Sequence, residues 1–164
     1  MVLKDLDNNF ENFLNQIKQN PKHLELVLYE LNLWLSSENK HGNKIPQLID
    51  ILYTILGQSP NLAKEIFNTS VLAYNYNNIL SYSLLINLVH IDTTLADEVF
   101  SLLRKYLEKN ASEGMLVCLC RLLIKLSIKH IDLKDKIHDF AKFILTLDAN
   151  GKYSEKEAKC ILSM

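Results

Sequence analysis

Apolar residues recur along this chain every three or four positions, which is the spacing of one face of an α-helix. The first example places Leu6, Phe10, Phe13 and Ile17 on a single face. The alternation of apolar and polar residues that marks a β-strand is scarce, and the chain has only four glycines and three prolines. The pattern therefore predicts an all-α protein.

Start signals divide this pattern into about nine helices. Ser154, with Glu157 three residues later, predicts a capping box at the last helix. Residues suited to cap a helix N-terminus precede five other segments: Asn20, Ser59, Asp92, Ser112 and Asp132. The expected helices span about residues 2–18, 21–35, 46–57, 60–67, 74–90, 93–109, 113–129, 133–147 and 155–164.

Two short segments occur twice at similar spacings. Residues 84–88 (LLINL) are repeated 38 positions later as 122–126 (LLIKL), and 62–67 (LAKEIF) are repeated 33 positions later as 95–100 (LADEVF). A period of 33–38 residues is typical of helical solenoids, in which each helix pair buries its apolar face against its neighbours.

At these repeated residues the chain resembles the HEAT/armadillo group of α-solenoids, over about residues 44–147. The resemblance implies one domain, built as a right-handed superhelix of about nine helices in antiparallel pairs. Three helix-pair repeats would occupy 44–147, between an N-terminal capping pair at 1–43 and a C-terminal capping helix at 148–164. It also implies a non-enzymatic scaffold that binds a protein or peptide on its concave face.

Peptide-binding armadillo repeats carry a Trp and, four residues later, an Asn on the inner helix. Here Asn87 lies in a similar context, but Ser83 stands at the Trp position. The next repeat has Arg121 and Lys125 at these two places. The asparagine ladder of those proteins is therefore not implied, although Ser83 and Asn87 stay candidate partner-binding residues.

The basic residues of the seventh expected helix form one stripe. Arg121, Lys125 and Lys129 lie four residues apart and so share a helix face. We interpret the stripe as a surface for an acidic peptide or partner. The alternative is a solvated edge, or pairing with acidic residues such as Glu108 and Asp135.

Segment 74–78 supplies further candidates, Tyr74 and Tyr76, because tyrosines and amides are common at recognition surfaces. The same composition also suits an ordered connection at which a helix is interrupted or begins. A second copy of the chain is another candidate partner, since a short solenoid with an incomplete cap exposes an apolar end.

Composition narrows the function classes. Eighteen Lys and Arg residues balance 19 Asp and Glu residues, so no overall positive field attracts nucleic acid or an anionic membrane. Nucleic-acid binding by a HEAT-like protein, using the basic stripe and Lys142, is the alternative function. No uncharged apolar stretch reaches membrane-spanning length, and we expect a soluble, cytoplasmic protein with free, buried cysteines.

Signals for metal or catalytic chemistry are missing from the sequence. The five histidines have no zinc-type spacing with each other or with cysteines. No glycine-rich phosphate loop or nucleophile elbow occurs. We therefore expect no metal site, no cofactor and no enzymatic activity.

Overall fold

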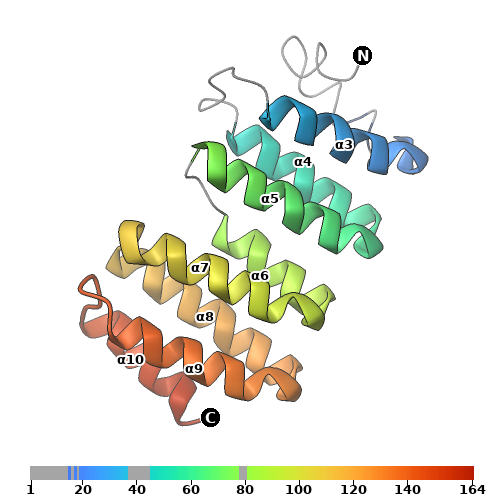
Figure 1. Cartoon of the computed structure of the whole chain (residues 1–164). Coiled ribbons are helices and arrows are strands. Elements are labelled where there is room, and N and C mark those ends of the chain that lie inside the picture. Colours follow the sequence, from blue (N-terminus) through green and yellow to red (C-terminus); the bar gives the residue numbers. More distant parts are fainter. Residues whose placement is uncertain (1–14, 16, 18, 37–44, 78–80) are drawn as a thin grey trace. The chain divides into compact units, whose positions relative to one another are not determined.

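The protein is all-α in every part that the structure describes. The computed structural model describes residues 15, 17, 19–36, 45–77 and 81–164, except the side chains of Pro21, Ile45, Tyr76 and Asn77. Within these ranges there are eight α-helices and no strand (Figure 1). The helices are α3 (Leu24–Leu35), α4 (Ile45–Gln58), α5 (Ala63–Asn77), α6 (Tyr82–Ile91), α7 (Ala96–Asn110), α8 (Glu113–Lys129), α9 (Lys134–Leu145) and α10 (Lys152–Leu162). The all-α prediction is confirmed, while most of the first expected helix lies outside the described residues.

A short 3₁₀ turn precedes four of the helices. These turns are Pro21–His23 before α3, Pro60–Leu62 before α5, Thr93–Leu95 before α7 and Ile131–Leu133 before α9. The residue ahead of each turn has φ between −128° and −140° and ψ between 68° and 97°. The last three turns each end in a buried leucine. The repeated segments 62–67 and 95–100 begin at two of these leucines, so the sequence repeat marks a turn-and-helix unit.

Two of the expected N-caps form as predicted. The Asp92 carboxylate accepts a hydrogen bond from the Thr94 N–H at 3.0 Å, and the Ser112 hydroxyl accepts one from the Met115 N–H. Ser59 is placed at an N-cap but makes no side-chain cap bond. The prediction for Asp132 is wrong, because the chain turns two residues earlier and His130 holds the cap position.

The start of α10 also differs from the prediction. Gly151 is the N-cap, and Ser154 lies inside the first turn, where its hydroxyl accepts the Gly151 N–H at 2.8 Å. Ser154 is fully buried and donates to Asn150 Oδ1 at 2.7 Å, which holds it one turn inside the helix. The predicted capping box with Glu157 is therefore wrong.

Helix α5 is longer than predicted. It continues through the polar segment at 74–77, which ends the helix instead of interrupting it. Its buried polar residues are compatible with a helix interior because their hydroxyls reach carbonyl groups one turn back. The Ser70 hydroxyl lies 2.9 Å from the Ile66 oxygen, and the Thr69 hydroxyl lies 3.0 Å from the Glu65 oxygen.

The chain divides into two compact units, Met1–Leu84 and Leu85–Met164, with the division inside α6. In the first unit, α5 packs against both α3 and α4. The Thr69 hydroxyl donates to Asn32 Oδ1 at 2.8 Å and joins α5 to α3. The fully buried residues of this unit include Leu31, Leu35, Ile51, Ile55 and Ile66. The single domain with three helix pairs stays a prediction.

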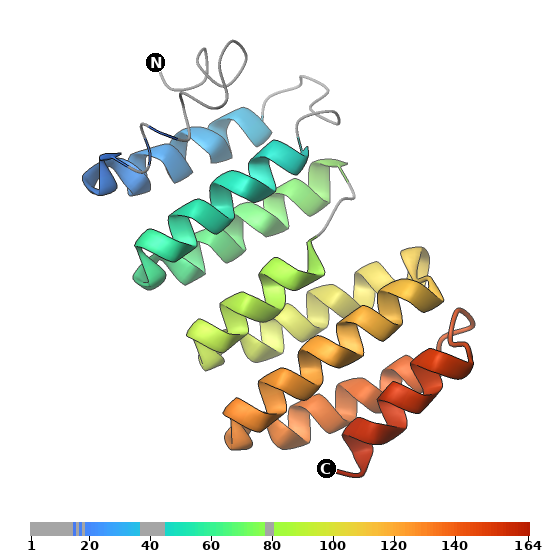
Figure 2. The ribbon, with the colours of Figure 1, turned by 180° about the vertical axis from the view of Figure 1, so that it is seen from behind.

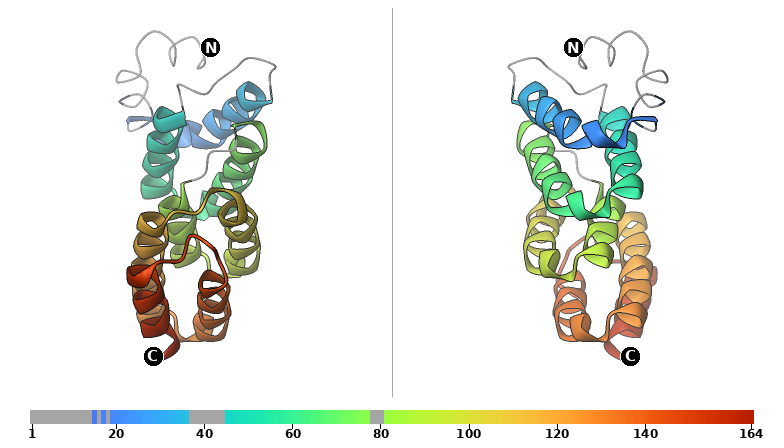
Figure 3. Two further views of the ribbon diagram at one scale, coloured as in Figure 1. Left: turned by 90° about the vertical axis from the view of Figure 1, so that its left-hand side faces the viewer. Right: turned by 90° about the vertical axis from the view of Figure 1, so that its right-hand side faces the viewer.

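The second unit is built in two layers. Helices α7 and α9 pack together in one layer, and α8 packs with α10 in the other, where α10 also contacts α9 (Figures 2 and 3). The part of α6 from Leu85 onward lies beside α8 in the second layer (Figure 2). Between the layers is a core of fully buried side chains that includes Leu88, Leu103, Leu123, Phe140 and Ile144.

Phe140 is central to this core. Its ring centroid lies 5.1 Å from that of Phe100 and 5.7 Å from that of Phe143. The Arg104 guanidinium lies over both Phe140 and Phe143 and pairs with Asp139 at 2.6 Å. An aromatic side chain of α9 thus links the core to the charged edge between α7 and α9.

We expect Phe140→Ala to lower the free energy of unfolding by about 3–5 kcal/mol, because it removes a fully buried ring and leaves a cavity. Urea unfolding followed by circular dichroism measures this loss. The matched control is Ile131→Ala, whose side chain is 81% exposed, and it should change stability by less than about 0.5 kcal/mol. Equal losses in both variants would contradict the assignment of Phe140 to the core.

Candidate functional site

The basic stripe of α8 is divided between two neighbouring helices. Arg121 Nε lies 3.0 Å from Glu157 Oε1 of α10 and forms an ion pair with it. Lys129 Nζ reaches in the other direction, to 3.4 Å from His90 Nε2 of α6. Lys125 makes no ion pair with any residue that the structure describes. The stripe is therefore not a uniform line of free cations, and its acidic partner is Glu157, not Glu108 or Asp135.

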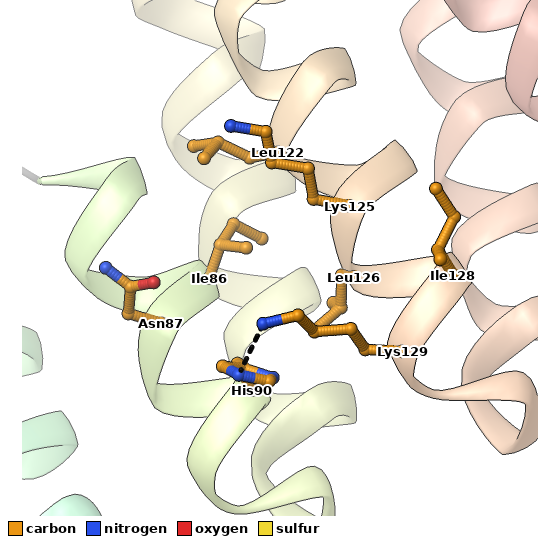
Figure 4. A pocket seen from close by; sticks show the side chains of 8 residues that line it. All are labelled: Ile86, Asn87, His90, Leu122, Lys125, Leu126, Ile128 and Lys129. Atoms are coloured by element: carbon orange, nitrogen blue, oxygen red, sulfur yellow. Dashed lines mark hydrogen bonds between the residues drawn. The ribbon is translucent and has the colours of Figure 1, made fainter.

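A pocket of about 260 Å³ lies between α6 and α8, beside Lys125 and Lys129 of this stripe. Apolar side chains make most of its wall, and amide, imidazole and ammonium groups stand at its rim. Figure 4 shows Lys125 and Lys129 extending from α8 toward α6. The lining residues are Ile86, Asn87 and His90 from α6 and Leu122, Lys125, Leu126, Ile128 and Lys129 from α8.

The sequence repeat explains why these residues meet. Segment 84–88 lies on α6 and its copy, 122–126, lies on α8, so two neighbouring helices with the same apolar pattern flank the pocket. Asn87 and Lys125 hold the same position in the two copies, and both reach the rim. A repeated apolar pattern has thus produced one pocket with different polar groups on its two sides.

The apolar wall is open to solvent on the side of α8. Ile128 is 65% exposed, and Leu122 is half-buried. Helix α8 has apolar residues nearly all round, which predicts that it is the most buried helix. That prediction is wrong, because a helix in a two-layer unit meets neighbours on only part of its circumference. The remaining apolar surface forms the wall of the pocket.

At the end of the pocket, Lys129, His90 and His130 form a chain of polar contacts. His90 Nδ1 lies 2.7 Å from His130 Nε2, and the two rings meet edge to face with centroids 4.9 Å apart. An ammonium group can only donate, so His90 Nε2 accepts from Lys129. The proton of a neutral His90 then lies on Nδ1 and is donated to His130 Nε2. His90 is neutral in this arrangement.

Burial lowers the pKa of His90 below its ordinary value, and the charge of Lys129, together with that of His130 when it is protonated, lowers this pKa further. The hydrogen bonds also favour the neutral form of His90, since a protonated ring would direct a second N–H at the Lys129 ammonium. A cation at His90 is therefore unfavourable in the isolated protein.

This shift makes folding stability depend on pH. The unfolded chain takes up a proton at His90 near pH 6.5, but the native protein resists that proton. Stability should therefore fall as the pH drops from about 6.5 through the lower native pKa, and level off below it. His90→Asn should weaken this dependence, and His23→Asn, an exposed histidine outside the network, should leave it intact. Urea unfolding between pH 5 and 7.5 measures it.

Only some of the candidate partner-binding residues that the sequence suggested lie at the pocket. Asn87, Lys125 and Lys129 come together at the pocket. Ser83 does not reach the pocket, because its hydroxyl lies 2.6 Å from the Tyr53 hydroxyl in the first unit. Tyr74 is half-buried on α5, in the first unit. Tyr76 belongs to α5, but its side chain lies outside the described residues.

His90 is the main residue that the sequence analysis missed. Its partner, His130, lies 40 positions later, which is far outside the spacing of a metal-binding pair. The repeat period of 33–38 residues was the signal that could have paired them. Residues separated by about one repeat become neighbours on adjacent helices.

Opposite the pocket, the other side of α8 holds α10 in place. Glu113 Oε1 accepts a hydrogen bond from the Tyr153 N–H at 3.0 Å, which places a carboxylate at the N-terminus of α10. A Cβ atom at Gly151 would displace this carboxylate from its position beside the Tyr153 N–H. A hollow of about 470 Å³ beside these groups is lined by residues of both helices, among them Cys118, Arg121 and Glu157.

All three cysteines are free, but only Cys120 is buried. Cys118, two residues earlier on α8, faces the opposite way and is exposed, as is Cys160. The expectation of buried thiols is thus wrong for these two. Burial, helped by the negative charge of Glu157, raises the pKa of Cys120 to about 12. Its thiolate is therefore nearly absent at neutral pH.

Alkylation should separate the three thiols. In the native protein at pH 8, iodoacetamide should label Cys118 and Cys160 at least tenfold faster than Cys120, because the thiolate is the reacting species. Mass spectrometry of tryptic peptides measures the three rates. Labelling in urea is the control and should make them similar. Fast native labelling of Cys120 would contradict its placement in the core.

Comparisons with known proteins add no family. No family model matches the chain, and no curated protein or solved structure matches it. In the described ranges, no helix is both long and apolar enough to cross a membrane. The same ranges hold no group of three or more His, Cys, Asp or Glu side chains that could bind a metal ion. The pocket between α6 and α8 is therefore the main guide to function.

Proposed function

We propose that this chain is a short HEAT/armadillo-like α-solenoid that binds a partner protein or peptide and has no enzymatic activity. The recurrence of one local unit supports the architecture. The four 3₁₀ turns that precede α3, α5, α7 and α9 begin 39, 33 and 38 residues apart. In the second unit, side-chain contacts such as Arg104 with Asp139 and Lys136 with Asp97 join residues 35 and 39 positions apart. Both spacings are close to one repeat.

The observation that carries the proposed function is the apolar pocket with an uncompensated cationic rim. Exposed apolar surface beside charged groups is characteristic of binding sites. Neither Lys125 nor Lys129 has an acidic partner among the described residues, and Lys129 Nζ instead lies 3.4 Å from His90 Nε2. An acidic, partly apolar partner would compensate both the exposed surface and the charge.

The size of the pocket favours a side chain over a whole small molecule. Sites for small ligands usually measure about 300–1,000 Å³ and bury most of the ligand. This pocket is about 260 Å³ and open along α8. A protruding apolar side chain of a partner segment, with an adjacent carboxylate near Lys125 or Lys129, would fill it.

Nucleic-acid binding is not proposed. Arg121 is paired with Glu157, which leaves Lys125 and Lys129 as the cations of the stripe without an acidic partner among the described residues. Two such cations provide few phosphate contacts. The free cysteines fit a reducing compartment, and we propose a cytoplasmic location on that ground.

Charge reversal tests the function. The double variant Lys125→Glu, Lys129→Glu should lower the recovery of specific partners at least tenfold, because like charges opposed at an interface cost several kcal/mol. The measurement is quantitative affinity capture of the tagged chain from its own cells, with folding checked by circular dichroism.

The matched control is Lys105→Glu, Lys109→Glu, which reverses two exposed lysines with the same spacing on α7. This control should keep its partners. If both double variants recover the partners at the wild-type level, the pocket is not the binding site.

A further inference from the structure

The rim of the pocket combines two lysines with a histidine whose two ring nitrogens are both engaged. Lys129 of α8 approaches His90 Nε2. His130, the residue just before the Ile131–Leu133 turn, faces His90 Nδ1. Lys125 is the other charged group at the pocket. No acidic side chain of the described residues pairs with any of these four groups. The charges that act on His90 in the free protein, those of Lys129 and of a protonated His130, are positive.

We propose that the pocket binds a carboxylate next to a bulky apolar side chain of a partner protein, and that binding this carboxylate is coupled to the uptake of one proton by His90. This inference rests on the proposed function and specifies its ligand. The apolar side chain would occupy the wall formed by Ile86, Leu122 and Leu126. The carboxylate would lie at the rim, between Lys129 and His90.

The donors and acceptors around His90 explain why carboxylate binding and proton uptake are coupled. Without a ligand, Lys129 donates to His90 Nε2, so this nitrogen must stay unprotonated. A bound carboxylate offers Lys129 a better acceptor and releases Nε2. His90 can then take a proton on Nε2 and donate it to the same carboxylate, while Nδ1 continues to donate to His130. The protonated ring has an acceptor on both sides only when the ligand is present.

Electrostatics act in the same direction. Burial and the neighbouring positive charges lower the pKa of His90 in the free protein. A carboxylate within hydrogen-bond distance favours the cation and raises that pKa. Each unit by which binding raises the His90 pKa strengthens binding tenfold at low pH relative to high pH. Aspartate and glutamate side chains of the ligand stay ionised above about pH 5, so their own titration does not mask the effect.

The probe is the peptide acetyl-Gly-Leu-Asp-Phe-Glu-Gly-amide, titrated into ¹⁵N-labelled protein by NMR at pH 7.5 and 5.5. We expect amide shifts concentrated at Asn87, Lys125 and Lys129, and a dissociation constant about tenfold lower at pH 5.5. The imidazole signals of His90, followed from pH 5 to 8, should show a higher titration midpoint in the presence of saturating peptide. This last measurement needs no variant.

Two controls isolate the carboxylate and the histidine. The peptide acetyl-Gly-Leu-Asn-Phe-Gln-Gly-amide keeps the apolar side chains but lacks the charge, and it should bind more weakly with no pH dependence. The variant His90→Asn should bind the acidic peptide with equal affinity at both pH values. His23→Asn should behave as the wild type.

The outcomes separate this inference from the proposed function. If the acidic peptide binds at the pocket with equal affinity at both pH values and the His90 midpoint does not move, proton coupling is overturned and the pocket remains a peptide site. If neither peptide binds, but reversal of Lys125 and Lys129 still abolishes partner capture, the ligand class is wrong. If that reversal also has no effect, the proposed function fails as well.

Discussion

The packing of amphipathic helices in two layers is the constraint on which the site depends. A helix in such a unit meets neighbours beside it and across the core, but one edge stays in solvent. Helix α8 has apolar residues on that edge as well as on its core face. Because α6 lies beside it, the surplus apolar surface forms a pocket wall with Ile128 exposed. The same repeated pattern that builds the core therefore also creates the site.

Local signals were enough to predict the all-α class and several helix starts. Asp92 and Ser112 cap helices where the sequence indicates, since an N-cap depends on residues only two or three positions away. The missed features needed contacts from further along the chain. Helix α5 passes through residues 74–77, and Ser154 is drawn into the first turn of α10 by burial and Asn150. Segment composition does not contain that information.

The candidate site was predicted only in part, because it too depends on contacts between residues far apart in the sequence. Four-residue spacing places Arg121, Lys125 and Lys129 on one face, but it does not say which helix each residue meets. In the structure, Arg121 pairs with Glu157 on α10, and Lys129 contacts His90 on α6. One cation is neutralised and another becomes part of the pocket rim. Only the repeat period, which brings residues about 40 positions apart together, could have anticipated the His90–His130 contact.

The close approach of Glu113 to Gly151 gives the glycines of this chain unequal freedom to change. The backbone of Gly151 has φ −107°, which any residue adopts, so its constraint comes from a side chain on another helix. Gly57 and Gly114 lie in helices with no atom near the space that a Cβ would fill. Alanine at these two positions is compatible with the packing and would favour the helix by less than the roughly 0.5–1 kcal/mol expected in a helix interior, because Gly57 and Gly114 each lie one residue from a helix end. An engineer seeking a more stable form of the protein would therefore change Gly57 and Gly114 and keep Gly151.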